Sequence, residues 1–266
     1  MAEPTPNAAM KILREPTVYV TGRQNVNLDD IDRFLDDHGV AWQTDTLVAG
    51  EHLVETAGRI CYMSFAKPRP GGNQAYIGHI LEVGHGSVLE HAVWNLLITG
   101  VSRSLTHELI RHRAGFGYSQ LSQRYVDESV AEYVEPDCIA DDPELHQIWL
   151  ETVTQTHQGY VKLTEKLLKT FEAEPDKTLR RKLARQAARS VLPNATETKI
   201  FVTANARALR HFIELRGNRH ADTEIRKLAI AVLRILQQEA PNLFGDYQLA
   251  PLGDGTFEAT TPYRKV

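Results

Sequence analysis

The feature that most constrains the fold of this chain is a long helical pattern between Glu144 and Phe171. Apolar residues recur there at the three- and four-residue spacing of a single helix face. This face consists of Leu145, Ile148, Trp149, Val153, Leu163, Leu167 and Phe171. Asp176 follows Pro175 and is a preferred N-cap residue, so a second helix is expected soon afterwards. The pattern predicts two consecutive helices, the first of them long.

Strand patterns elsewhere in the chain indicate that the fold is mixed. Between Ala92 and Thr99, apolar residues alternate with a mixed set, which is typical of a strand with one buried face. Shorter strands are expected at 17–21 and 199–203. Further helices are expected at 51–60, 74–83, 102–112, 205–216 and 221–239, with a loop at 67–73 and an irregular acidic stretch at 127–142. We therefore expect a mixed α/β fold.

The composition bounds the domain organisation. A chain of 266 residues with 42% apolar and 24% charged residues can bury one large core or two small ones. No internal repeat and no clear linker divides it. We assign residues 1–16 to an N-terminal arm, 17–250 to a single catalytic domain and 251–266 to a C-terminal tail.

Several partners and locations are not expected. No apolar run approaches the roughly 20 residues that cross a bilayer, and the N-terminal residues lack the apolar centre of a signal peptide. Two cysteines, Cys61 and Cys138, cannot form a disulfide framework, which favours a reducing cytoplasmic location. The net charge of −4 argues against general nucleic-acid binding, because affinity for nucleic acids comes mainly from clustered Lys and Arg.

The stretch that is richest in charged and hydrogen-bonding side chains lies between His107 and Tyr125. This stretch combines Arg111, His112 and Arg113 with two glycines and with the hydroxyl and amide side chains of 118–124. We expect Ser102 to cap a helix reaching His112, so that Glu108, Arg111 and His112 share one polar face. Such a combination is unsuited to a packed core and favours binding of a phosphorylated ligand.

Metal and nucleophile chemistry are weaker interpretations. The run from Thr106 to His112 resembles the HExxH zinc motif, but its second histidine stands one position too late to share a helix face with the first. No metal is therefore expected. Cys61 lies in no catalytic motif and is more typical of a small buried residue. Ser87 does not lie in a G-x-S-x-G turn.

A second group of polar residues is expected on the helix at 205–216. Arg216 falls on the same stripe as Leu209, and an inward arginine must be paired or bound to a ligand. An ion pair with Glu214 or Glu224 is the structural alternative. Arg207 and His211 form a further polar patch one turn apart.

Several separated motifs of the chain resemble one known family. In chain order they are GHGSVLEH, HELIRHR, YSQLSQRYV, ARSVLPNATET, NARALRHF and ELRGNRHADTEIR. Together they are similar to the flavin-dependent thymidylate synthases, in particular the bacterial branch that carries YSQLSQRYV. The resemblance runs from about Leu53 to Phe244.

The resemblance implies a fold and a reaction. The fold is α+β, a mixed and largely antiparallel sheet packed with long helices, in a homotetramer with active sites shared between subunits. The reaction makes dTMP from dUMP. Methylenetetrahydrofolate is the carbon donor, and FAD reduced by NADPH is the hydride donor. No nucleophilic cysteine is then needed.

The resemblance also assigns roles to residues. Those matching the flavin-binding positions are Ser87, Arg111, His112, Arg113, Gln120, Asn205, Arg207 and His211. Those matching the dUMP-binding positions are Glu108, Leu109, Ile110, Arg111, Gln120, Leu121, Ser122, Gln123, Arg124, Arg189 and Arg216. Arg216 matches the catalytic arginine that activates the uracil ring, where a permanently charged guanidinium can stabilise developing negative charge.

One departure from the family pattern concerns spacing. Eight residues, 114–121, separate the Arg-His-Arg triplet from Ser122, which is one more than the family signature usually has. The extra residue is expected within 114–117, where glycines let the backbone bulge.

An alternative hypothesis is a nucleic-acid-binding module that uses the Arg/Tyr cluster at 111–125, with Tyr118 and Tyr125 stacking on bases. It predicts salt-dependent binding of oligonucleotides and no response to dUMP.

Overall fold

The computed structural model describes residues 10–67 and 69–265, so most of the predicted arm, residues 1–9, lies outside the described residues. The chain forms two compact units. Of the described residues, the first unit contains 10–16, Ile98–Glu108 and Ser119–Ile200. The second contains 17–67, 69–97, Leu109–Tyr118 and 201–265. The domain boundaries drawn from the sequence remain a prediction.

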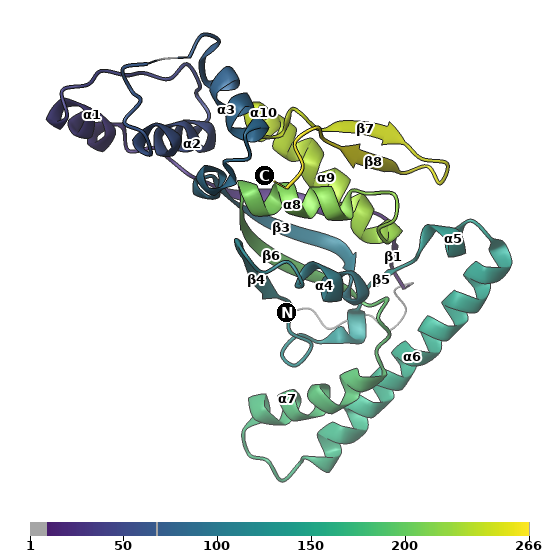
Figure 1. Ribbon diagram of the computed structural model, residues 1–266. Coiled ribbons are helices and arrows are strands. Elements are labelled where there is room, and N and C mark those ends of the chain that lie inside the picture. Colours follow the sequence, from purple (N-terminus) through teal and green to yellow (C-terminus); the bar gives the residue numbers. More distant parts are fainter. Residues whose placement is uncertain (1–9, 68, 266) are drawn as a thin grey trace. The chain divides into compact units, whose positions relative to one another are not determined.

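A four-stranded sheet has the order β2-β3-β6-β4 (Figure 1). Its strands are β2 (Thr17–Arg23), β3 (Val93–Ser102), β6 (Glu197–Asn205) and β4 (Phe116–Gln120). The predicted alternation in β3 is confirmed, because Trp94, Leu96 and Ile98 are buried while the residues between them are partly exposed. The strands predicted at 17–21 and 199–203 are also confirmed, although both are longer. β4 has no counterpart among the predicted elements.

The first unit is dominated by the two predicted helices. They are α6 (Pro143–Thr170) and α7 (Lys177–Ala188), which lie side by side in Figure 1. Asp176 caps α7 as expected, accepting from the backbone N–H groups of Thr178 and Leu179. Asp142, which was not predicted as a cap, caps α6 in the same way by accepting from Glu144 and Leu145. Much of the apolar stripe of α6 stays exposed, including Leu145, Ile148 and Leu163.

The region predicted to be irregular contains short elements of the same unit. These are η2 (Glu128–Val130), β5 (Tyr133–Val134) and α5 (Asp137–Ala140). β5 pairs in parallel with β1 (Ile12–Leu13), and η3 (Arg189–Val191) follows α7. The acidic composition of this region thus did not predict β5, whose two residues are buried.

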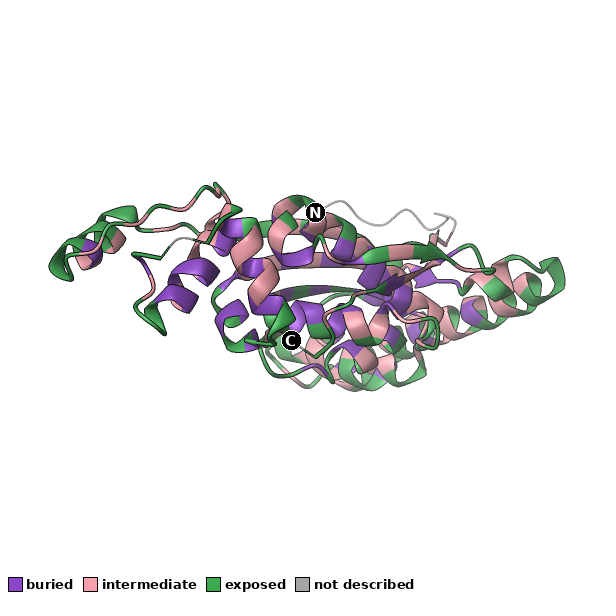
Figure 2. Ribbon diagram, turned by 45° about the horizontal axis from the view of Figure 1, so that its top comes forward, coloured by how far each residue is buried: buried purple, intermediate pink, exposed green. Residues whose placement is uncertain are grey.

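The second unit packs its helices around an apolar core. Its helices are α1 (Leu28–Asp37), α2 (Ala49–Ile60), α3 (Gly72–Glu82), η1 (Gly86–His91), α8 (Ala206–Arg216), α9 (Thr223–Glu239) and α10 (Pro241–Phe244). β7 (Gln248–Pro251) pairs antiparallel with β8 (Phe257–Thr260). α1 is mostly exposed (Figure 2). Its buried residue is Leu35. α9 contributes most to the core through a continuous buried face from Ile225 to Leu236.

The predicted helix over 102–112 is partly wrong. Ser102 caps α4 (Arg103–Leu109) as expected, its Oγ accepting from the Leu105 N–H at 3.0 Å. The helix nevertheless ends at Leu109, and the chain then turns. Arg111 and His112 therefore do not continue a helical face that begins at Glu108. Gly115 in this turn has φ of +73°, which favours glycine.

Two further expectations need correction. Cys61 is exposed instead of buried, and Cys138 is exposed as well. On α8 the arginine in the core is Arg210, which is 2% exposed, while Arg216 is only half-buried. The prediction of a mixed fold with long helices and an antiparallel sheet is confirmed. In residues 10–67 and 69–265, no helix combines the length and apolar composition that a membrane span requires.

Candidate functional site

In the second unit, the turn after α4 is fixed by two sets of contacts. The Tyr118 hydroxyl donates to the carbonyls of Leu109, at 2.9 Å, and His112, at 2.7 Å. Burial raises the pKa of Tyr118, so the hydroxyl stays protonated and can donate. On the other side, the Asn205 N–H donates to the Gly115 carbonyl at 3.1 Å. These contacts hold the turn against the first residues of α8.

Gly115 is required for this close approach. A Cβ at this position would lie 2.7 Å from Asn205 Nδ2 and 2.8 Å from Ala208 Cβ, in addition to the strain of its positive φ. The segment 114–117 is largely exposed to solvent, but at Gly115 its backbone lies directly against the start of α8. The prediction that this segment contains the one residue more than the family signature remains a prediction.

His112 is the buried residue of the Arg-His-Arg triplet, with 8% exposure. Its ring packs edge-on against Phe212, with centroids 5.3 Å apart and an interplanar angle of 85°. Arg216 Nε donates to His112 Nε2 at 3.1 Å. The pKa of His112 is lowered to about 4, mainly because the ring is buried. The charges of Arg216 and His211 lower this pKa further. The imidazole is therefore neutral near pH 7.

Three other cations that we expected at this site, Arg111, Arg113 and Arg207, are exposed. Arg111 and Arg113 flank His112 at the surface, and Arg207 on α8 forms an ion pair with Glu90 at 2.6 Å. Asn205 caps α8 by accepting from the Ala208 N–H at 2.9 Å. His211 and Ser87 are exposed too. The turn and the start of α8 form a basic surface suited to an anionic ligand.

Leu109 and Ile110 differ in accessibility. The Leu109 side chain belongs to the core, and its carbonyl accepts from Tyr118, whereas Ile110 is exposed. A ligand at this turn could reach the Ile110 side chain directly but not that of Leu109.

In the first unit, the segment 120–124 is held by backbone and side-chain contacts. Gln120 Nε2 donates to Thr106 Oγ1 at 3.1 Å and to Thr198 Oγ1 at 3.3 Å. The Leu121 N–H donates to the Lys199 carbonyl at 2.9 Å. Ser122 Oγ accepts from the Arg124 N–H at 3.4 Å. The segment thus begins as the end of β4 and continues as a tight turn.

Two buried donors of this segment point to a ligand. Within the part of the chain that the structure describes, neither Gln123 Nε2 nor Arg124 Nε has a hydrogen-bond partner. Leaving a buried donor unsatisfied costs about 1–3 kcal/mol, more for a charged group. Water or a bound anion is the natural acceptor for both groups.

Helix α7 contacts the residues that follow the 120–124 segment, Tyr125 and Asp127. Arg185 Nη1 donates to the Tyr125 carbonyl at 2.7 Å, and Nη2 contacts the Asp127 carboxylate at 2.8 Å. The Lys182 ammonium lies 5.3 Å from the Tyr125 ring centroid. Arg189 follows Arg185 after four residues, at the end of α7, and is half-buried. Arg185 was not among the predicted site residues, although its spacing from Arg189 is visible in the sequence.

Glu128 is the most perturbed carboxyl near this segment. It is 5% exposed, and no described residue donates to its Oε1. Burial raises the pKa of Glu128 to about 7, against the opposing charge of Arg103. Between pH 4.5 and 7 the folded protein therefore binds more protons here than the unfolded chain does. Stability is lost as the pH rises through this window.

We expect Glu128→Gln to stabilise the protein at pH 8, by about 1–3 kcal/mol at the 1.36 kcal/mol that one pKa unit represents, with little change at pH 5. Urea unfolding at the two pH values measures this difference. The exposed carboxyl of Glu151 on α6 supplies the control, Glu151→Gln, which should change stability little at either pH. Equal destabilisation of Glu128→Gln at both pH values would show that the carboxyl is charged and satisfied.

The predicted site residues fall into two groups. In the second unit lie Ser87, Leu109, Ile110, Arg111, His112, Arg113, Asn205, Arg207, His211 and Arg216. In the first unit lie Glu108, Gln120, Leu121, Ser122, Gln123, Arg124 and Arg189. Within the second unit, Arg216 is hydrogen-bonded to His112. Within the first, two buried donors of the 120–124 segment, Gln123 Nε2 and Arg124 Nε, have no hydrogen-bond partner among the described residues.

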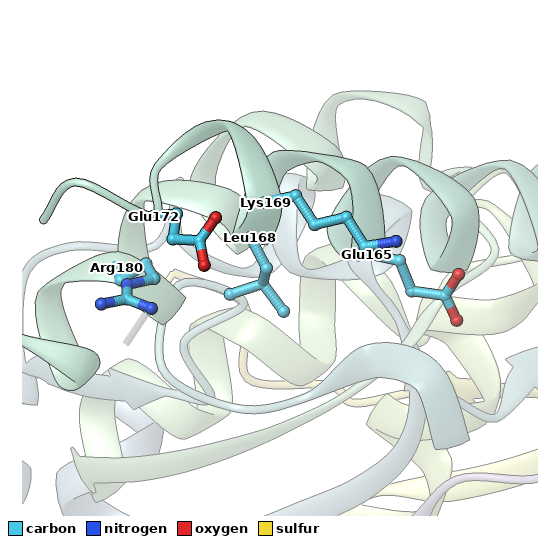
Figure 3. A pocket seen from close by; sticks show the side chains of 5 residues that line it. All are labelled: Glu165, Leu168, Lys169, Glu172 and Arg180. Carbon is cyan, nitrogen blue, oxygen red and sulfur yellow. The ribbon is translucent and has the colours of Figure 1, made fainter.

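A surface pocket of the α6–α7 pair is not a candidate site. It has a volume of about 340 Å³ and is lined by Glu165, Leu168, Lys169, Glu172 and Arg180 (Figure 3). The Arg180 guanidinium already donates to the Glu174 carbonyl. None of the predicted site residues lines this pocket.

Comparison with known proteins shows to which family this chain belongs. Residues 44–242 match the family described as thymidylate synthase complementing protein. The chain belongs to this family. The matched range contains every residue of both groups, from Ser87 to Arg216.

Members of the thymidylate synthase complementing protein family are similar to the chain over most of its length. A flavin-dependent thymidylate synthase of Mycobacteroides abscessus is 55% identical over 225 residues, covering 84% of this chain and 89% of that protein. One of Mycobacterium avium is 54% identical, covering 86% and 92%. One of Corynebacterium diphtheriae is 48% identical, covering 90% and 96%.

A solved structure with 20% identity shares the fold. It is a UMP/dUMP methylase of Streptomyces cacaoi bound to 5-Br dUMP, with a TM-score of 0.63, covering 89% of this chain and 96% of that one. The comparisons give no support to a nucleic-acid-binding module at 111–125.

Proposed function

We propose that this chain is a flavin-dependent thymidylate synthase that makes dTMP from dUMP. Methylenetetrahydrofolate supplies the carbon, and NADPH-reduced FAD supplies the hydride. The observation that carries the proposal is the family match over 44–242, with relatives of that name more than half identical over 84–86% of the chain.

The second unit offers a suitable surface for the flavin. Arg111, Arg113 and Arg207 present charged donors around the start of α8, and the helix N-terminus adds a favourable dipole. The pyrophosphate of a dinucleotide matches such a donor set. The remaining residues that we assign to the cofactor are Ser87, His112, Gln120, Asn205 and His211. When bound, FAD carries the redox step, and the protein supplies position and charge.

The first unit supplies donors for the nucleotide. Arg124 and Arg189 are permanent cations, and Ser122 adds a hydroxyl, which together fit a phosphate. The unsatisfied donors of Gln123 and Arg124 agree with an anionic ligand at this turn. Glu108, Gln120 and Leu121 complete the dUMP-binding set, with Ile110, Arg111 and the backbone at Leu109 as further contacts.

Arg216 is the residue to which we assign the chemistry. Its guanidinium stays protonated, so it acts by stabilising negative charge that develops on the N3/O4 edge of the uracil ring, not as a base. The contact of Arg216 Nε with His112 orients this side chain toward the Arg-His-Arg turn.

Assembly and location belong to the same proposal. The protein functions as a homotetramer in the cytoplasm, with residues of neighbouring subunits completing each active site. Residues 17–250 act as its catalytic domain.

The absorbance spectrum of the purified protein tests the proposal. A yellow protein with the visible bands of bound flavin, whose NADPH oxidation depends on dUMP, is expected. A colourless protein that cannot be reconstituted with FAD would refute it. Tight oligonucleotide binding that ignores dUMP would favour the alternative.

Arg185 provides a second test, directed at the nucleotide segment. We expect Arg185→Ala to raise the KM for dUMP about tenfold, because losing a charge-assisted bond worth about 1.5–3 kcal/mol loosens the turn that carries Arg124. FAD affinity and kcat should change little. Arg181 lies one turn earlier on α7 and is exposed, so Arg181→Ala is the matched control. An unchanged KM in Arg185→Ala would show that α7 does not support the nucleotide site.

A further inference from the structure

We propose that His112 is the positioning residue of Arg216, holding the catalytic guanidinium in one orientation through a hydrogen bond from Arg216 Nε to His112 Nε2. The catalytic meaning of this contact rests on the proposed function, whereas the contact itself is a feature of the structure. It assigns His112 a role within the protein itself, in addition to any contact with the cofactor.

The contact can fix the plane of the guanidinium. The Nε–H bond lies in the guanidinium plane, so an acceptor 3.1 Å from Nε restrains both the direction and the tilt of the group. The contact to His112 engages Nε, whereas the Nη1–Nη2 edge is the edge with which a guanidinium recognises a carbonyl or imide. Uracil presents such an edge at N3/O4.

The imidazole is itself held rigidly. Phe212, one helical turn before Arg216 on α8, packs edge-on against the His112 ring. Phe116 lies on another side, with its ring centroid 5.9 Å away. The carbonyl of His112 accepts from Tyr118, which fixes the backbone. A buried ring with these neighbours cannot turn freely, so its Nε2 stays aimed at Arg216.

The contact requires one protonation state. His112 Nε2 can accept only when the ring is neutral with its proton on Nδ1. The charged and titratable groups facing the ring are Arg216 and His211 from α8, and Tyr118 from the turn. The two α8 groups disfavour an imidazolium, so the acceptor persists down to about pH 5, below the ordinary pKa of histidine.

Nitrogen NMR of the flavin-free protein tests the contact without using activity. At pH 7 we expect His112 as the neutral tautomer protonated on Nδ1, and an Arg216 Nε–H resonance that shifts in His112→Phe. The tautomer protonated on Nε2, or an imidazolium, would overturn the proposal. This readout holds whether or not the protein makes dTMP, so it separates failure of the inference from failure of the proposed function.

Kinetics of a matched pair of variants test the consequence. His112→Phe keeps an aromatic ring and removes the acceptor, and we expect kcat to fall about 10- to 100-fold, the scale of a small misplacement of a reacting group. His112→Gln restores an acceptor oxygen and should recover a large part of that loss. Flavin content is measured in the same samples, so that kcat is compared at equal flavin loading. Equal kcat in wild type and His112→Phe, or equal losses in both variants, would contradict the positioning role.

Discussion

Replacing Arg216 with alanine is expected to lower the rate of dTMP formation by about 10²–10³-fold, the usual cost of losing a group that stabilises charge in the transition state. Arg216 is half-buried at the end of α8, and its Nε contacts the neutral imidazole of His112. Arg216 is the residue to which we assign charge stabilisation at the uracil edge. FAD should still bind, because the cations assigned to it lie elsewhere on the turn and on α8. Single-turnover measurement of dTMP, with flavin content determined from the same sample, gives both quantities.

Two further variants define how specific this effect is. Arg219→Ala removes a neighbouring, exposed arginine whose ion pair with Glu258 is a surface contact, and it should leave turnover nearly unchanged. Arg216→Lys keeps the charge but loses the planar donor edge, so only a small part of the activity should return. Turnover retained in Arg216→Ala would remove Arg216 from the catalytic role.

Replacing Arg210 with alanine is expected to lower the free energy of unfolding by about 3–5 kcal/mol, the cost of breaking a buried ion pair. Arg210 is the core arginine of α8, and both its Nη atoms contact the Asp246 carboxylate, at 2.6 and 2.8 Å. Nη1 also donates to the Leu243 carbonyl at 2.6 Å, and the guanidinium lies 4.8 Å from the Tyr247 ring centroid. Alanine leaves a nearly buried carboxylate without its cation and a cavity beside it.

Chemical denaturation at pH 7 measures this loss. An exposed ion pair, Arg23 with Glu239, provides the contrast within the same unit, and Arg23→Ala should cost no more than about 1 kcal/mol. If Arg210→Ala costs as little as Arg23→Ala, the buried ion pair does not hold this end of α8 to the C-terminal residues.

The elements that the sequence predicted well are those with local periodicity. The alternation in β3 and the three- and four-residue spacing of α8 and α9 each follow from one buried face. The spacing in α6 also predicted its helix, although much of that apolar stripe is exposed. The cap of α7 was also predicted, because an aspartate N-cap satisfies the free N–H groups at the start of a helix in any context.

The features that were missed depend on residues distant in sequence. α4 ends at Leu109 because the following turn is seated on α8, through Gly115 and Asn205, almost a hundred positions later in the chain. Arg210 is buried in preference to Arg216 because Asp246 lies in reach of it, and no spacing rule within α8 reveals that partner. The two units are each assembled from three segments, so no linker in the sequence marks them.

The candidate site was recognisable mainly through its motifs. The residue types of 107–125 indicated a phosphorylated ligand, but their grouping into a turn on α8 and a separate segment beside α7 required the fold. Arg185 illustrates the limit, since its contacts with Tyr125 and Asp127 join residues about sixty positions apart.

The most direct test of the proposed function is the product formed by the purified protein with dUMP, methylenetetrahydrofolate, NADPH and FAD, with each component omitted in turn. We predict that dTMP appears in the complete mixture and that omission of any one component from flavin-stripped protein abolishes it. Formation of dTMP without flavin and NADPH, or its absence from the complete mixture after FAD has bound, would contradict the proposed function.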